Sequence, residues 1–588
     1  MRKLLTLLAL GTALLPGGTA LARVAAPAPV QSAAPFTFEK LMVPMRDGAK
    51  LETVILRPRD QKGPLPILLS RTPYGVPEEA PRGVPGSWAA LAKDGYIFVQ
   101  QSMRGRFGSD GTFTLSNAIT PGKGVDEASD AYDTIDWLVK HVADNNGRVG
   151  MWGVSYPGLT AAIALAKPHP ALKAVSPQAA WTDYWMNDDL HRNGAMRLTY
   201  ATDWLYMLQW DKTDDATFEY DRYDTYDWFL NAGSPADIEA KYLKGRVPMF
   251  SAMLDHPDYD DFWKKQVWTD HLPRGATKVA TLNVAGFWDQ EDPWGSWQIY
   301  AAQEAHDPGG LNFMVSGPWN HGSWRGPGNA LGRIPIPAQS GTEFREQIEA
   351  PFFAHFLHGT GKAPGFEAAM FQSGSWQWKR YAKWPVPSTP RSLYLHADGS
   401  LSFDAPAEGE ACRDYLSDPN NPVPFRERPI SPTYPAPEWQ WWEAADQRFV
   451  AGRPDVLSWV SAPLAADLTI TGEPVAHLFA STTGTDSDFV VKLIDVYPED
   501  YEAVPRGPLG AYTNSLNGYQ LPIGMQVKRG RYLKDRSHAA PLTPGKVEEW
   551  PIPLNQKDHV FKAGHRIMVQ VQSSWFPMID RNPQTFVP

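Results

Sequence analysis

The sequence predicts an α/β domain that is interrupted by a helical insertion and followed by an all-β jelly-roll domain. Short apolar runs alternate with helix-like periodicity over residues 37–182 and again over 271–383, a pattern typical of parallel strands buried on both faces. Residues 183–270 are helical in pattern, aromatic and acidic, with no obvious buried strand. From residue 384 onward the helical periodicity nearly disappears, and strand-like runs are separated by Pro, Gly and Asn.

The composition indicates a large globular protein that does not depend on disulfides. A chain of 588 residues allows about three or four domains, and its only cysteine, Cys412, cannot form an intrachain disulfide. The 55 Lys and Arg against 65 Asp and Glu give a net charge of −10 without a basic run, which argues against a nucleic-acid binder. The 24 Trp suit pockets for ring-bearing ligands.

The N-terminus has the pattern of an export signal. Arg2 and Lys3 precede an apolar stretch over residues 4–15, and small residues lead to a cleavage site after Ala22. That stretch is too short to span a bilayer, which makes a membrane anchor the weaker alternative. We therefore expect a signal peptide over 1–22, a flexible lead over 23–36, and a periplasmic or secreted protein.

The first part of the α/β domain, residues 37–182, begins with a hairpin. Residues 38–56 alternate apolar and polar side chains around Asp47-Gly48, a dipeptide that suits a tight turn. A helix is expected over residues 126–142, because one face is apolar and acidic residues occupy the first turns. Buried strands are expected at 66–70, 96–100 and 148–153, and a second helix after the last of them.

The second part, residues 271–383, resumes the strand pattern at 279–284 and 311–315. The insertion over 183–270 therefore interrupts one domain, and we interpret it as a cap over the sheet. In the C-terminal jelly roll, residues 384–588, the strand-like runs are 392–396, 476–480, 488–494 and 566–571.

Ser155 is a candidate nucleophile, because it lies where a buried strand ends and a helix begins. The usual G-x-S-x-G elbow is only partly met, since Pro157 replaces the last glycine. Asp289 follows the strand at 279–284 and His321 follows the strand at 311–315, which is the order of nucleophile, acid and base in α/β hydrolases. A plain turn serine and a hydrogen-bonded surface histidine are the structural alternatives.

The chain resembles the serine hydrolases that comprise α-amino acid ester hydrolases (β-lactam antibiotic acylases), cocaine esterase and the X-prolyl dipeptidyl peptidases. The resemblance runs from about Phe38 to the end of the chain, and G-x-S-Y-x-G is the usual elbow in this family. The motifs that carry it are RTPYG over 71–75, MRGRFGSDG over 103–111, DTIDWL over 133–138 and GVSYPG over 153–158.

The resemblance implies a role for each candidate residue and implies neither a metal nor a cofactor. Ser155 would be the nucleophile, His321 the general base and Asp289 its orienting acid. The backbone N–H of Tyr156 and the hydroxyl of Tyr74 would form the oxyanion hole; without the resemblance, Tyr74 would pass for a core tyrosine.

One position departs from the family pattern. Members often carry Gln-Asp-x-Arg-Gly, whereas this chain has Gln101-Ser102-Met103-Arg104-Gly105. The acid that Ser102 replaces is interpreted as structural, so the departure puts a local salt bridge in doubt and not the chemistry.

The segment around Asp289 places three carboxylates in four residues, because Glu291 and Asp292 follow closely. Such charges repel one another in a packed site unless a cation neutralises them; a solvated acidic loop is the generic alternative. The resemblance to α-amino acid ester hydrolases implies that Glu291 and Asp292 join a third acid at the start of the cap to hold the α-ammonium of the substrate. The matching position is Asp189, chosen by alignment over the adjacent Asp188.

We therefore expect a serine hydrolase or acyltransferase that cleaves esters and β-lactam amides of α-amino acids through an acyl-Ser155 intermediate. An X-prolyl dipeptidyl peptidase, a glutaryl-type acylase and a broad esterase are alternatives within the family, although the acidic cluster disfavours a glutaryl group. A catalytically inactive carbohydrate-binding protein is the alternative from another class.

The expected partner is a small-molecule substrate, with no nucleic acid and no membrane, and the resemblance implies a homo-oligomer, specifically a homotetramer. Family members continue beyond the segment that matches residues 586–588, so a jelly roll that is incomplete at its C-terminus is a further expectation.

Overall fold

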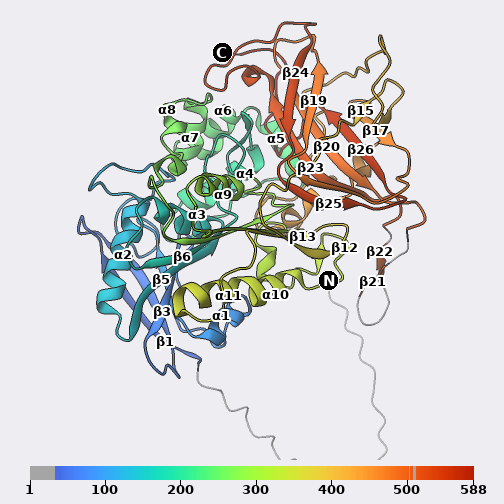
Figure 1. Cartoon of the computed structure of the whole chain (residues 1–588). Helices are drawn as coiled ribbons and strands as arrows, with labels where there is room; N and C mark the ends of the chain where they lie inside the picture. Colours follow the sequence, from blue (N-terminus) through green and yellow to red (C-terminus); the bar gives the residue numbers. More distant parts are fainter. Residues whose placement is uncertain (1–33, 502–503, 507–511, 515, 588) are drawn as a thin grey trace, which may run out of the picture.

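The computed structural model describes residues 34–501, 504–506, 512–514 and 516–587. The expected signal peptide and most of the expected lead lie outside these residues. Figure 1 shows a central sheet flanked by helices, a group of cap helices above it, and a β-rich domain beside the cap. No helix in the described part of the chain has the length and apolar character needed to cross a membrane.

The core of the α/β domain is a ten-stranded mixed sheet. The predicted hairpin forms its edge as the antiparallel pair β1 and β2, the strands from β4 to β13 run parallel, and β14 closes the sheet antiparallel. The carboxyl ends of the parallel strands therefore share one edge, where ligands bind in open α/β sheets. In spatial order the strands are β1 (Phe36–Pro44), β2 (Lys50–Pro58), β4 (Ile97–Ser102), β3 (Leu65–Thr72), β5 (Asn145–Val154), β6 (Leu172–Gln178), β9 (Ala280–Gly286), β10 (Asn312–Gly317), β13 (Ala368–Gln372) and β14 (Gln377–Tyr381).

Helices cover both faces of this sheet, because alternate residues of a strand point to opposite sides. Ile67 and Leu69 of β3 pack in one hydrophobic cluster with α2 (Glu127–His141) and α3 (Tyr156–Ile163). Leu68, between them, belongs to the opposite cluster with α1 (Ala89–Asp94) and α11 (Ala350–Phe353). The other helices of this domain are α9 (Gly295–Glu304) and α10 (Ser340–Phe344).

The insertion between β6 and β9 is helical, as predicted, only from Leu198 onward. Before it the chain forms the short antiparallel ladder of β7 (His191–Arg192) and β8 (Ala195–Met196), and all four residues are buried. The prediction of an insertion without a buried strand is wrong here, because two-residue strands are too short to establish an alternating pattern. The cap helices are α4 (Leu198–Gln209), α5 (Thr225–Ala232), α6 (Pro235–Ile238), α7 (Pro248–Asp255) and α8 (Asp261–Lys264).

The C-terminal domain is β-rich, as predicted. Its main sheet has the order β15-β16-β17-β26-β20-β23, and β18 pairs with β25 and β19 with β24. The bounds are β15 (Tyr394–Leu395), β16 (Ser400–Ser402), β17 (Leu457–Ser461), β18 (Leu468–Gly472), β19 (Val475–Ala480), β20 (Asp488–Val496), β23 (Gln520–Arg529), β24 (Glu548–Pro553), β25 (Lys557–Phe561) and β26 (Arg566–Gln572). Small pairs are β11 (Ala330–Leu331) with β12 (Ile334–Pro335), and β21 (Val504–Arg506) with β22 (Tyr512–Asn514).

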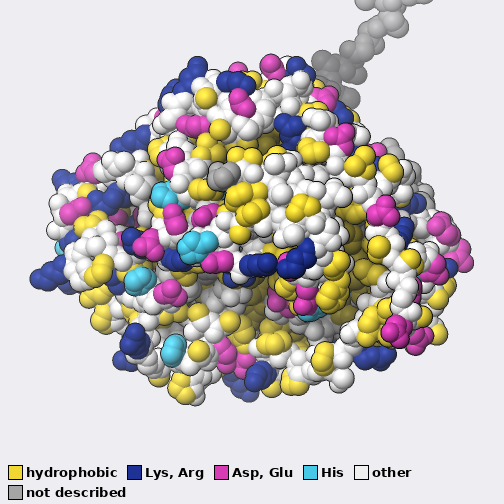
Figure 2. Space-filling view, turned by 90° about the horizontal axis from the view of Figure 1, so that it is seen from above, with side chains coloured by type: hydrophobic (Ala, Val, Ile, Leu, Met, Phe, Trp, Pro, Cys, Tyr) yellow, Lys and Arg dark blue, Asp and Glu magenta, His cyan; other side chains and the backbone are white. Residues whose placement is uncertain are grey.

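The β-rich domain packs directly behind the loop that follows β9. Phe287 and Trp288 of this loop share one hydrophobic cluster with Phe489, Leu521 and Trp550 of the β-rich domain. On the face shown in Figure 2, basic and acidic side chains are interspersed, and hydrophobic side chains gather around a central hollow.

Candidate active site

Ser155 occupies a strained turn between β5 and α3. Its backbone has φ 65° and ψ −131°, a region that non-glycine residues rarely adopt and that is typical of a serine presented at the edge of a sheet. The turn brings α3 very close to the neighbouring strand β6, since a β-carbon at Gly158 would lie 2.3 Å from the carbonyl oxygen of Gln178. Glycine is therefore required at 158, one position later than in the generic elbow motif.

His321 and Asp289 lie together, as predicted, in the loops after β10 and β9. The Nδ1 of His321 lies 2.9 Å and 3.1 Å from the two carboxylate oxygens of Asp289. Asp289 Oδ1 also accepts the backbone N–H groups of Glu291 and Asp292, each at 2.9 Å. Burial opposes ionisation of Asp289, but His321 and these N–H groups lower its pKa below the ordinary value.

The second ring nitrogen of His321 does not make the expected contact. The role of general base predicts a hydrogen bond between this nitrogen and Ser155, but His321 Nε2 has no hydrogen-bond partner in the described part of the chain. It lies 3.3 Å from Oε2 of Glu291, an ion-pair contact. Burial alone would lower the pKa of His321, but the carboxylates of Asp289 and Glu291 outweigh it and raise that pKa to about 9.

Of the two predicted oxyanion donors, Tyr156 directly follows Ser155, and Tyr74 follows the end of β3. The backbone N–H of Tyr156 belongs to the first turn of α3, where N–H groups have no partner within the helix. The hydroxyl of Tyr74 accepts a hydrogen bond of 3.3 Å from the indole N–H of Trp204. Burial raises the pKa of Tyr74 far above its ordinary value, so this hydroxyl keeps its proton and is able to donate it to an oxyanion.

Asp189 and Asp292 are buried carboxyl groups with unused acceptor capacity. Asp189 Oδ2 and both carboxyl oxygens of Asp292 have no hydrogen-bond partner among the described residues. Burial raises the pKa of Asp189 to about 7, and burial together with the nearby Asp189 and Asp188 raises the pKa of Asp292 well above its ordinary value. Unpaired buried carboxyl oxygens are costly, and an ammonium group with three N–H donors would satisfy several of them at once.

Asp188 differs from Asp189 in having both oxygens engaged. Its Oδ1 accepts from the backbone N–H of Gly295 at 2.8 Å, and its Oδ2 accepts from the N–H of Thr182 at 3.3 Å. Asp188 therefore ties the start of the cap to α9, and the free oxygen of Asp189 makes Asp189 the better candidate ligand, as the alignment indicated.

Glu291 is held by donors from two other parts of the chain. Tyr434 Oη and Trp439 Nε1, both C-terminal to the α/β domain, donate to Glu291 Oε1 at 2.9 Å and 2.7 Å. Tyr200 Oη, from cap helix α4, lies 2.7 Å from Asp189 Oδ1 and 3.3 Å from Glu291 Oε2. These contacts fix the position of the Glu291 carboxylate relative to the cap.

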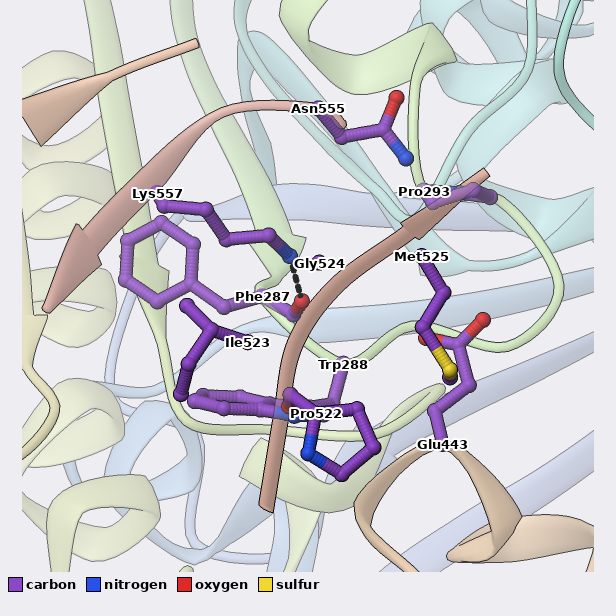
Figure 3. Close-up of a pocket in the computed structure, with 10 residues that line it drawn as sticks. All are labelled: Phe287, Trp288, Pro293, Glu443, Pro522, Ile523, Gly524, Met525, Asn555 and Lys557. Atoms are coloured by element: carbon purple, nitrogen blue, oxygen red, sulfur yellow. Dashed lines mark hydrogen bonds between the residues drawn. The ribbon is translucent and has the colours of Figure 1, made fainter. Parts of the chain in front are cut away.

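The segment 287–292, here called the acid loop, is anchored from both sides. On the cap side, Arg197 donates to the backbone oxygens of Gln290 and Glu291 at 2.6 Å and 2.7 Å. On the side of the β-rich domain, Trp288 Nε1 donates to the carbonyl of Pro522 at 2.7 Å, and Lys557 Nζ donates to the carbonyl of Phe287. Figure 3 shows Trp288, Pro522 and Lys557 around a small pocket behind the acid loop.

Ser102, the position that departs from the family pattern, forms a hydrogen bond with a neighbouring carboxylate. Its hydroxyl donates to Glu52 Oε2 at 3.1 Å, and Glu52 forms a 2.7 Å salt bridge with Lys40. The carboxylate beside Ser102 therefore comes from β2 and is neutralised by Lys40.

Two family models cover most of the chain. Residues 47–323 match the model of X-Pro dipeptidyl-peptidase (S15 family), and residues 358–587 match that of the X-Pro dipeptidyl-peptidase C-terminal non-catalytic domain. Cocaine esterase from Rhodococcus sp. (strain MB1 Bresler) is 29% identical over an alignment 574 residues long, which covers 93% of this chain and 92% of that protein.

Two solved structures are similar over nearly the whole chain. An α-amino acid ester hydrolase superposes with a TM-score of 0.89 at 39% identity, covering 96% of this chain and 94% of that one. An aminopeptidase from the marine sediment archaeon Thaumarchaeota archaeon superposes with a TM-score of 0.88 at 40% identity, covering 97% and 94%. The chain belongs to the cocaine esterase/X-Pro dipeptidyl-peptidase family.

Membership of the cocaine esterase/X-Pro dipeptidyl-peptidase family confirms the predicted fold class and the prediction that the protein is a hydrolase. The sequence did not point to four side chains around the acid loop that complete the site, namely Arg197, Tyr200, Tyr434 and Trp439. Arg197 and Tyr200 follow Asp189 within eleven residues, so their proximity was an available signal. The irregular segment that carries Tyr434 and Trp439 offered none.

Proposed function

We propose that the protein hydrolyses esters and related amides of substrates with a free α-ammonium group, through an acyl intermediate on Ser155. The observation that carries this proposal is a pair of buried carboxyl groups near Asp289 and His321. Oδ2 of Asp189 and both carboxyl oxygens of Asp292 have no hydrogen-bond partner among the described residues. A neutral acyl chain would leave those oxygens unsatisfied, whereas an ammonium group would bind them through charge-assisted hydrogen bonds.

In the proposed reaction Ser155 Oγ attacks the acyl carbonyl, and its proton passes to Nε2 of His321. Asp289 holds Nδ1 of His321 and stabilises the imidazolium that forms. The negative charge on the carbonyl oxygen is stabilised by the N–H of Tyr156 and the hydroxyl of Tyr74. The imidazolium then protonates the leaving alkoxide or amine, and water repeats the sequence on the acyl-serine ester.

The aromatic side chains near Ser155 support a ring-bearing acyl group. Tyr156 packs edge-on against Trp181 with centroids 5.0 Å apart, and Trp181 packs edge-on against Trp204 at 5.7 Å. Tyr200 stacks on Trp204 at 5.6 Å, beside the carboxylate of Asp189 that it contacts. An amino acid side chain such as that of phenylglycine combines a ring for these faces with an ammonium for the carboxylates.

An aminopeptidase activity is the second candidate. A relative with 40% identity is described as an aminopeptidase, and removal of an N-terminal residue also requires recognition of an α-ammonium. The two activities differ in the leaving group, since a peptide amide needs protonation by His321 before it departs, whereas an ester alkoxide is a better leaving group.

A substrate panel with one protein preparation tests these proposals. We expect kcat/KM for phenylglycine methyl ester to exceed that for methyl phenylacetate, its des-amino analogue, by well over tenfold. Phenylglycine p-nitroanilide would report the aminopeptidase activity, and an X-Pro-anilide would report a dipeptidyl peptidase. Equal rates for the two esters would contradict ammonium recognition, and failure of a fluorophosphonate to label Ser155 at a pH above the His321 pKa of about 9 would contradict the nucleophile.

A further inference from the structure

The nitrogen of His321 that must accept the proton of Ser155 is in ion-pair contact with a carboxylate, without a hydrogen bond to it. His321 Nε2 lies 3.3 Å from Glu291 Oε2, and it has no hydrogen-bond partner among the described residues. A nitrogen that carries a proton toward Glu291 cannot act as a base toward Ser155. Catalysis therefore requires that this contact be broken or that its proton be removed.

We propose that Glu291 keeps His321 protonated and inactive in the free protein, and that the α-ammonium of the substrate releases the base by taking over Glu291 Oε2. This inference rests on the proposed function, because it assigns the ammonium a second effect besides affinity. Glu291 thereby couples recognition of the amine to activation of Ser155, so that a neutral ester meets a histidine that is still protonated.

The surroundings of Glu291 allow a substrate ammonium to replace His321 as the partner of Oε2. Oε1 is occupied by the donors Tyr434 and Trp439, so the carboxylate is held in place and cannot swing away from His321. Among the described residues, Oε2 has only the longer contacts to His321 and Tyr200, both at 3.3 Å. An incoming ammonium can approach Oε2 more closely than either of them, since charge-assisted N–H···O bonds are typically about 2.7–2.9 Å long.

The carboxylates around His321 all favour its protonated form. Asp289 and Glu291 come from the acid loop and Asp189 from the start of the cap, and all three raise the pKa of His321, to about 9 in total against the effect of burial. The positive charge of Arg197 opposes the effect of burial on Asp189 and lowers the pKa of that carboxyl. An ammonium placed among these carboxylates cancels part of their field, which lowers the pKa of His321 when the substrate is bound.

The proton balance of the step is simple. The Nε2–H bond of His321 breaks, its proton passes to water, and the lone pair on Nε2 becomes the acceptor for the Ser155 hydroxyl. The substrate ammonium keeps its three protons and donates hydrogen bonds to Glu291. No oxidant, metal or further reactant is needed.

The pH dependence of Glu291→Gln on a neutral ester tests the inference. With methyl phenylacetate, the acidic limb of kcat/KM in the wild type should have a high midpoint, and Glu291→Gln should shift it to lower pH by at least one unit. At pH values below both midpoints, the variant should then hydrolyse this ester about tenfold faster than the wild type. A loss of activity with an unchanged midpoint would overturn the inference, because a merely structural role of Glu291 predicts that result.

Asp292→Asn is the matched control. Asp292 lies in the same loop, and burial together with the neighbouring carboxyls raises its pKa well above the ordinary value, but the ion pairs of His321 are with Asp289 and Glu291. The midpoint with methyl phenylacetate should stay at its wild-type value in this variant. An equal shift in Asp292→Asn and Glu291→Gln would show a general field effect and would overturn the specific role of Glu291.

A measurement on the wild-type protein covers the case in which the variant does not fold. With ¹⁵N-labelled histidine, the resonance of His321, assigned by its absence in His321→Gln, should titrate at least one unit lower with phenylglycinol than with 2-phenylethanol. An unchanged midpoint would overturn the inference. A different result would contradict the proposed function itself, namely a wild type that shows no preference for phenylglycine methyl ester over methyl phenylacetate.

Discussion

Trp439 donates an indole hydrogen bond of 2.7 Å to Glu291, although the two residues lie 148 positions apart in the chain. The C-terminal part of the protein therefore reaches into the site that the α/β domain carries. Because Glu291 lies in the acid loop between Asp289 and the buried carboxyl of Asp292, this contact links the position of the C-terminal segment to substrate recognition.

The first prediction is that Trp439→Phe weakens selection for amines. The variant keeps an aromatic ring but removes the donor to Glu291 Oε1, which frees the carboxylate to move. A hydrogen bond to a charged group contributes about 1.5–3 kcal/mol, so the ratio of kcat/KM for phenylglycine methyl ester over methyl phenylacetate should fall about tenfold. Steady-state kinetics with both esters measures this ratio.

Trp442→Phe is the control for that prediction. Trp442 is buried in the same cluster, 6.1 Å from the ring of Trp439, but its indole nitrogen has no hydrogen-bond partner among the described residues. This variant should lose some stability to a cavity and keep the wild-type selectivity. Equal selectivity losses in both variants would show that packing, and not the hydrogen bond to Glu291, controls recognition.

The second prediction is that Ser155→Ala abolishes turnover and leaves the fold intact. Removing a serine nucleophile commonly reduces the rate by more than about 10³, and labelling by a fluorophosphonate should disappear. Ser176→Ala, on the adjacent strand β6, removes another buried hydroxyl, which donates to Leu282, and should retain both labelling and turnover. Retention of a tenth of wild-type activity by Ser155→Ala would disprove the nucleophile assignment.

The sequence was sufficient to place Ser155, Asp289 and His321 within a few residues of the ends of three strands, because the apolar patterns of these strands are strong. Parallel strands bring their carboxyl ends to one edge, so positions far apart in sequence could be placed together without a structure. The hairpin around Asp47-Gly48 and the helix after Asp126 were predictable for a similar reason, since their turn and capping residues act locally.

The sequence could not reveal which side chains complete the site. Tyr434 lies outside the helices and strands, and Trp439 lies in a 3-10 helix of 4 residues, which is too short to establish a period in the sequence. Their contacts with Glu291 depend on how the C-terminal part packs on the cap. The orientation of His321 Nε2 toward Glu291 also depends on the conformation of two loops. Patterns of residue type carry no information on such orientations, because they arise from tertiary packing.

The third prediction is that Lys557→Met lowers kcat for amine-bearing and neutral esters alike. Lys557 is buried, burial lowers its pKa to about 8, and its ammonium donates to the carbonyl of Phe287, two residues before Asp289. Without this donor the acid loop is expected to shift, and small misplacements in an active site cost about 10- to 100-fold in rate. The measurement is kcat for both esters, whose ratio should not change.

Lys492→Met provides the comparison for Lys557→Met. Lys492 is another buried lysine of the β-rich domain, with a pKa lowered to about 7 by burial, and it donates to Gln447 rather than to the acid loop. Thermal unfolding should report comparable changes in stability for the two variants. Only Lys492→Met should keep the wild-type kcat. Wild-type kcat in Lys557→Met would show that the acid loop does not need this anchor.

The fourth prediction concerns the pH dependence of ammonium binding. Burial raises the pKa of Asp189 to about 7, so this carboxyl is neutral at lower pH and attracts a cation only weakly. The affinity for phenylglycinol should therefore fall as the pH decreases below that value, by at most about tenfold per pH unit for each carboxyl that must ionise. Calorimetric titration of the inactive Ser155→Ala protein measures binding without turnover.

In Asp189→Asn the affinity for phenylglycinol should be lower above the pKa of Asp189 and should depend less steeply on pH, because one ionisation has been removed. An unchanged slope in Asp189→Asn would mean that Asp189 does not bind the ammonium and that Asp292 alone accounts for the pH dependence.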